Sequence, residues 1–149
     1  MADERRPVGA GPVGAGPVRA GPAGEGDGET PSGPFCVVWL YRDAPDAFER
    51  AARFALQNSA YGLEVVLLFT DAGARLLQVD RLAQVFRVPG LAALIKKLDE
   101  ANVRFELDIG AARRAGVVET LGVTIPNLRI ADERRVAELT TGARMTARY

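Results

Sequence analysis

The sequence of 149 residues contains no histidine and a single cysteine, Cys36. The lack of histidine excludes Ser-His-Asp and Cys-His catalysis, imidazole metal ligation and the usual switch near neutral pH. A single cysteine excludes an intramolecular disulfide, a CxxC redox pair and a zinc site built from cysteines. Because the sequence has neither a disulfide framework nor a recognisable signal peptide, we expect a cytoplasmic protein.

Two further absences concern charge and long apolar runs. Lysine and arginine number 19, and so do aspartate and glutamate, so the formal net charge of +0 attracts neither nucleic acid nor an anionic membrane. The apolar runs reach about seven residues, whereas a helix that spans a bilayer needs about 20. We therefore expect no nucleic-acid partner and no membrane partner.

The first 34 residues differ in composition from the rest of the chain. Glycine and proline recur there with a period of five, as in residues 7–11 and 12–16, and not with the period of three that collagen requires. Such a segment cannot offset the entropy lost on ordering. We predict a disordered tail over residues 1–34 and one folded domain over residues 35–149.

The first half of this domain alternates strand and helix patterns. Residues 35–41 and 63–69 are apolar runs of strand length without alternation, as in parallel strands buried on both faces. Between them, Asp43 is the expected N-cap and Gly62 the expected end of an amphipathic helix, which gives a βαβ unit. Residues 75–87 indicate one helix or two short ones, and their excess of apolar residues hints at a subunit contact or a deeply buried helix. A second clear helical stripe covers residues 91–98.

The second half supplies the remaining elements. A strand over residues 103–109 has Arg104, Glu106 and Asp108 alternating with apolar residues, which predicts one buried and one solvent-facing side. A short strand within residues 123–130 is an edge strand or starts after Pro126. A helix over residues 131–140 begins at Asp132, and residues 143–149 form a half-exposed last strand in which Ala143, Met145, Ala147 and Tyr149 share one face. The order of elements predicts an α/β fold, a three-layer α/β/α sandwich with a mainly parallel sheet of about five strands, flavodoxin-like in appearance.

The candidate site lies at the carboxyl edge of this sheet, where ligands bind in open α/β folds. There the third strand turns into a small-residue helix, and the loop after the second strand reaches the same edge. The loop lacks a dinucleotide fingerprint and a P-loop, so we expect no cofactor, and we expect no metal. The candidate binding residues are Asp108, Gly110, Arg113, Arg114, Thr70, Asp71 and Gly73.

Each candidate also has a structural interpretation. Asp108 is suited to capping the helix that follows it, and Thr70 and Asp71 are suited to capping the next helix. For Arg113 and Arg114 three roles are open: a solvated surface position, an ion pair with Asp108, or a small anion site. Cys36 lies early in a buried strand, at the end of the sheet opposite to the expected site, which favours an inert thiol.

Residues 111–117, Ala-Ala-Arg-Arg-Ala-Gly-Val, resemble the DsrE/DsrF-like (DsrEFH-like) family of small sulfur-relay proteins, as do the element order and the loop after the second strand. In that family a strand ends in a sulfur-carrying cysteine, followed by a small-residue helix with an Arg/Gly pair. Counting back from Gly116, that position falls on Asp108, and a carboxylate cannot hold a persulfide. The resemblance covers about residues 35–149 and implies a homo-oligomer with sulfur-relay or redox proteins as partners.

Three functions remain open at this point. The first is a non-catalytic binding or assembly subunit related to intracellular sulfur relay. The second is a sulfurtransferase that uses Cys36, which requires an exposed thiol with a lowered pKa. The third is a small-ligand or nucleotide-binding α/β protein that uses the loops at the carboxyl edge of the sheet.

Overall fold

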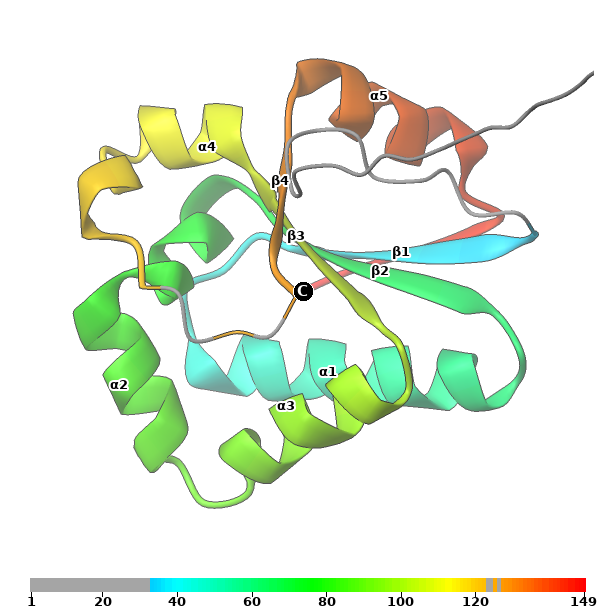
Figure 1. Cartoon of the computed structure of the whole chain (residues 1–149), viewed down its shortest axis with the longest axis horizontal. Helices are drawn as coiled ribbons and strands as arrows, with labels where there is room; N and C mark the ends of the chain where they lie inside the picture. Colours follow the sequence, from blue (N-terminus) through cyan, green and yellow to red (C-terminus); the bar gives the residue numbers. More distant parts are fainter. Residues whose placement is uncertain (1–32, 123–124, 126) are drawn as a thin grey trace, which may run out of the picture.

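The computed structural model describes residues 33–122, 125 and 127–149, and these form one five-stranded sheet with helices on both faces (Figure 1). The strand order is β4-β3-β2-β1-β5, and every neighbouring pair is parallel. The strands are β1 (Phe35–Leu40), β2 (Glu64–Phe69), β3 (Arg104–Asp108), β4 (Arg129–Ala131) and β5 (Met145–Arg148). The predicted α/β class and parallel sheet are confirmed. The tail predicted over residues 1–34 lies outside the described residues, except for residues 33 and 34.

One face of the sheet is covered by α1 (Pro45–Ala60) and α3 (Leu91–Glu100), as Figure 1 shows. The buried face of α1 consists mainly of alanines, which lets the helix approach the sheet closely. Gly62 follows this helix with φ +87°, the left-handed conformation that glycine adopts at helix ends. The predicted helix end at Gly62 is therefore confirmed.

The opposite face is crossed by α5 (Glu133–Gly142), which joins the edge strand β4 to the other edge strand β5. Right-handed crossovers that run in opposite directions along a sheet place their helices on opposite faces. The β4-to-β5 connection runs back across the sheet, so α5 lies on the face that α1 and α3 leave open. Trp39, Leu68 and Leu139 belong to the apolar cluster on this side.

The segment after β2 forms two short helices, which is one of the arrangements that the sequence left open. A 3-10 helix, η3 (Asp71–Leu77), is followed by α2 (Val79–Arg87), and Gln78 between them is extended. The remaining elements are α4 (Ile109–Arg114) and the 3-10 turn η4 (Val118–Thr120). The fourth strand starts after Pro126 and forms an edge, as predicted. No helix among the described residues is long and apolar enough to cross a bilayer.

One prediction of local structure is wrong. The N-cap of α1 is Ala44 and not Asp43, because the Asp43 carboxylate lies 3.2 Å from the guanidinium of Arg81 instead of folding back on its own helix. The last strand is half-exposed, as predicted: Met145 of β5 is 43% exposed, and β5 is an edge strand with only β1 beside it.

The predicted solvent-facing side of β3 is also wrong for two of its three residues. Glu106 is 1% exposed and Asp108 9% exposed. The cause is the position of the strand, since β3 lies between β2 and β4 and α5 packs over its second face. Both faces of such an interior strand are covered. Polar side chains on it therefore need hydrogen-bond or ion-pair partners within the protein.

Candidate functional site

The ends of β2 and β3 bring two polar side chains together at the carboxyl edge of the sheet. Phe69 is the register partner of Leu107, so the residues that follow them, Thr70 and Asp108, lie on neighbouring strands. The hydroxyl of Thr70 donates a hydrogen bond of 2.9 Å to Oδ2 of Asp108, and both side chains are buried. The contact joins the two loops that the sequence predicted to meet at this edge.

Asp108 is also the N-cap of α4. Its Oδ1 accepts a hydrogen bond of 3.0 Å from the backbone N–H of Ala111. The predicted capping role is confirmed, and both carboxylate oxygens have a donor within the protein. Asp108 therefore holds the strand-to-helix turn and ties it to the end of β2. Thr70, in contrast, makes no side-chain capping bond to η3, because its hydroxyl is directed to Asp108.

The charged residues around this edge pair with each other. Arg114 lies 3.8 Å from Oδ1 of Asp71, and both side chains are more than half exposed. An exposed pair of this kind contributes little to stability, about 0–1 kcal/mol. Within the part of the chain that the structure describes, the arginine partner considered for Asp108 thus goes to Asp71, and Arg113 is exposed without an ion pair.

Close packing requires the first of the two glycines of the predicted site, and the second lies in a tight but less constrained place. A Cβ atom on Gly73 would lie 1.9 Å from the carbonyl oxygen of Leu40, so η3 approaches the end of β1 more closely than any side chain permits. A Cβ atom on Gly110 would lie 3.2 Å from Nη1 of Arg114 and 3.3 Å from Oδ1 of Asp108. Gly110 thus leaves room for the guanidinium and the carboxylate on one side of the first turn of α4.

Cys36 lies far from this edge in the architecture of the sheet. It pairs with Val65 in the amino-terminal half of β1 and β2, whereas Asp108 is the last residue of β3. The side chain is 0% exposed, and burial raises the pKa of the Cys36 thiol above its ordinary value of 9.0. A buried thiol with a raised pKa is a poor nucleophile, because the thiolate is the reactive form.

The structure adds one buried ion pair that the sequence did not reveal. Arg135 of α5 donates to Glu106 of β3 through Nε (2.9 Å) and Nη2 (2.8 Å), a bidentate contact. Hydrogen bonding to Glu106 raises the pKa of Arg135, although burial alone would lower it. Glu106 stands two residues before Asp108 on the same face of β3, so the pair anchors α5 below the candidate site.

The arrangement has the chemistry of a positioned turn. Among the described residues, no three histidine, cysteine, aspartate or glutamate side chains lie together as metal ligands would. The polar groups form two pairs, Thr70 with Asp108 and Asp71 with Arg114. Such a cluster fixes the shape of the carboxyl edge and leaves Arg113 as a charged group directed to solvent.

The fold and this edge define a small α/β protein whose candidate site is built from the ends of two central parallel strands. A family model described as the DsrE/DsrF-like family matches residues 37–143, and the chain belongs to this family. The membership confirms the resemblance found in the sequence and relates the chain to sulfur-relay proteins. No curated protein sequence matches the chain.

A similar solved structure supports the fold. The crystal structure of the YchN protein from E. coli superposes with a TM-score of 0.57 at 17% sequence identity. The superposition covers 77% of this chain and 99% of YchN. At this identity the similarity shows a shared fold and nothing about residue roles.

Proposed function

We propose that this chain is a non-catalytic binding or assembly subunit of the DsrE/DsrF-like family, which forms a homo-oligomer and works beside sulfur-relay or redox proteins in the cytoplasm. The observation that carries the proposal is the side chain that stands at the carboxyl end of β3. A carboxylate ends this strand, and its two oxygens are engaged by Thr70 and by the N–H of Ala111. A group that is used in this way holds a turn and does not accept sulfur.

The state of Cys36 supports the same proposal. Sulfur transfer to a cysteine requires attack by a thiolate that a donor can reach. Burial and a raised pKa both oppose this step for Cys36. The alternative of a sulfurtransferase that uses Cys36 is therefore disfavoured, and the alternative of a small-ligand binder at the loops with Asp71 and Arg114 remains a prediction.

The decisive experiment compares sulfur uptake by four proteins under native conditions. These are the wild type, Cys36→Ala, and Cys36→Ala combined with either Asp108→Cys or Val118→Cys. Each is exposed to a persulfide donor, and the intact mass is read before and after denaturation. Val118 is the matched control because it is 39% exposed and lies outside the candidate site, in η4.

We expect no sulfur adduct on the folded wild type and rapid uptake by the variant with a cysteine at position 108. The physical reason is that the two donors now serving the Asp108 carboxylate, Thr70 and the N–H of Ala111, would stabilise a thiolate there. Uptake by native Cys36 would refute the non-catalytic role. If the position-108 cysteine reacted no faster than the Val118 control, Asp108 would not occupy the sulfur-carrying position.

The same preparations test the ligand-binding alternative. Native mass spectrometry of the freshly purified wild type reports any small molecule that stays bound. A bound molecule that is lost on Asp71→Ala and kept on Cys36→Ala would favour ligand binding at the carboxyl edge. The absence of any mass difference between native and denatured protein would leave the assembly role as the better explanation.

A further inference from the structure

Helix α2 carries apolar residues on two faces. Leu82 and Val85 are buried against the core, at 4% and 2% exposed. Val79 is 57% exposed and Phe86 36% exposed, and Ala83 between them is exposed as well. Positions 79, 83 and 86 have the i, i+4, i+7 spacing of one helix face. The helix therefore has a second apolar stripe, defined here as the α2 stripe, beside the side that faces the core.

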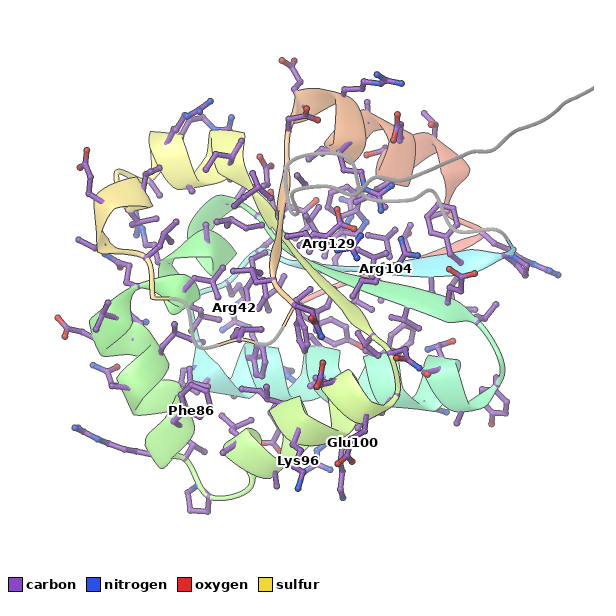
Figure 2. The ribbon with its side chains drawn as sticks, viewed as in Figure 1. Arg42, Phe86, Lys96, Glu100, Arg104 and Arg129 are labelled. Carbon is purple, nitrogen blue, oxygen red and sulfur yellow. The ribbon has the colours of Figure 1, made fainter. Side chains whose placement is uncertain are left out.

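The location of α2 leaves this stripe open to a partner. The helix lies at the rim of the molecule, where it packs mainly against α3 and η3 (Figure 1). Figure 2 shows Phe86 on α2 at this rim, next to the helix that bears Lys96 and Glu100. The excess of apolar residues that the sequence showed over residues 75–87 thus has an exposed part, as a subunit contact requires.

Two charges flank the α2 stripe. Asp80 follows Val79, and Arg87 follows Phe86. The two charged residues therefore lie on the same flank of the stripe, one at each end of the helix. Both are exposed, and neither takes part in an ion pair or side-chain hydrogen bond with the rest of the described chain. The flank therefore offers one negative and one positive group, seven residues apart.

We infer that the α2 stripe is a docking surface for a second copy of this chain, with the two α2 helices antiparallel about a two-fold axis near Ala83. A two-fold contact joins the same surface on both copies, so residue i meets j and j meets i. Val79 then faces Phe86 of the second copy, and Asp80 faces Arg87 of the second copy, twice per interface. The small Ala83 at the axis permits close approach of the helices.

The surface of α2 is too small to form a stable interface alone, so α2 is the centre of a larger contact. Nine residues of helix extend about 13 Å, whereas a stable interface covers about 800 Å² on each partner. Neighbouring elements complete the contact, because α3 and η3 pack beside α2.

This inference rests on the proposed assembly role and deepens it by naming the surface. The test uses the full chain with the charge reversals Asp80→Arg and Arg87→Asp, made singly and together. Arg134→Asp serves as the control, because Arg134 is an exposed charge on α5, the helix of the opposite layer. Self-association is measured by sedimentation velocity over a range of concentrations, and far-ultraviolet circular dichroism verifies that each variant is folded.

Each single reversal is expected to weaken self-association about tenfold or more, because two opposite-charge contacts per interface become like-charge contacts. The double variant is expected to associate as the wild type does. An equimolar mixture of the two single variants is expected to form heterodimers. In such a heterodimer the arginine introduced at position 80 faces the aspartate introduced at position 87, and the native Arg87 of one chain faces the native Asp80 of the other. The Arg134→Asp control is expected to associate normally.

The outcomes separate the surface from the assembly role. A wild type that is monomeric at every concentration would overturn both. A wild type that self-associates, with single variants that associate equally well, would overturn the α2 surface and leave the assembly role intact. Weakened single variants without recovery in the mixture would overturn the antiparallel Asp80–Arg87 pairing.

Discussion

The buried pair of Glu106 and Arg135 predicts a large loss of stability when only one partner is removed. Both side chains are almost fully excluded from water, at 1% and 2% exposed, and two hydrogen bonds of 2.9 Å and 2.8 Å join them. Arg135→Met keeps the length of the side chain but leaves the Glu106 carboxylate without its partner. Breaking a buried ion pair in this way costs about 3–5 kcal/mol.

The double variant separates this penalty from the net contribution of the pair. Glu106→Leu with Arg135→Met replaces both charges by apolar groups that suit the cluster around Trp39 and Leu68. Such a replacement is often neutral or stabilising, so we expect most of the loss to be recovered. The two substitutions should therefore couple strongly in a double-mutant cycle.

Denaturation by urea, followed through the fluorescence of Trp39, measures these changes. Trp39 is the only tryptophan and is 8% exposed, so unfolding moves it from the interior into water. A loss of 3–5 kcal/mol corresponds to a fall in melting temperature of about 10–20 °C for a domain of this size. A single-variant loss below about 1 kcal/mol, or a double variant less stable than either single one, would refute the reasoning.

Two further predictions concern Gly73 and Cys36. Gly73→Ala places a methyl group against a backbone oxygen at the end of β1. It should lower the free energy of unfolding in urea by about 3 kcal/mol or more. Gly33→Ala is the control and should have no effect, because nothing lies within 4 Å of its Cβ position. Because burial raises the pKa of the Cys36 thiol, the unfolded chain loses this proton at a lower pH than the folded protein. The free energy of unfolding should fall as pH rises from about 9, by at most about 1.4 kcal/mol per pH unit. Cys36→Ala should remove this component, and an unchanged pH slope in that variant would contradict the assignment.

The fold could be predicted because the two central strands, β1 and β2, are continuous apolar runs with a helix between them. Burial on both faces leaves a direct signal in the sequence of such strands. The strand order left no comparable signal, because it depends on where the long connection through α5 crosses the sheet. For this reason the adjacency of Thr70 and Asp108 was expected only at the level of a shared edge, and their hydrogen bond was not foreseen.

One face of β3 was wrongly predicted to face solvent for the same reason, because the tertiary arrangement leaves no local signal in the sequence. Alternation of charged and apolar residues predicts one wet face, and it cannot report that a helix 29 residues later supplies a matching charge. Glu106 and Arg135 each have an ordinary sequence context, a strand and an amphipathic helix. Their burial is a property of the tertiary structure alone, which is why the pair was missed while the cap at Asp108, a local feature, was found.

The position of β5 has a consequence for how the protein forms during synthesis. The parallel order places β5 beside β1, although these are the first and last strands of the described part of the chain. The backbone of Tyr41 also donates a hydrogen bond to the carbonyl oxygen of Tyr149. One edge of β1 therefore stays unpaired until the ribosome has made the other helices and strands that the structure describes. An open, apolar strand edge of this kind is a site for wrong pairing between nascent chains, so slow translation of the segment just before β5 should favour aggregation more than slow translation of the segment just before β1.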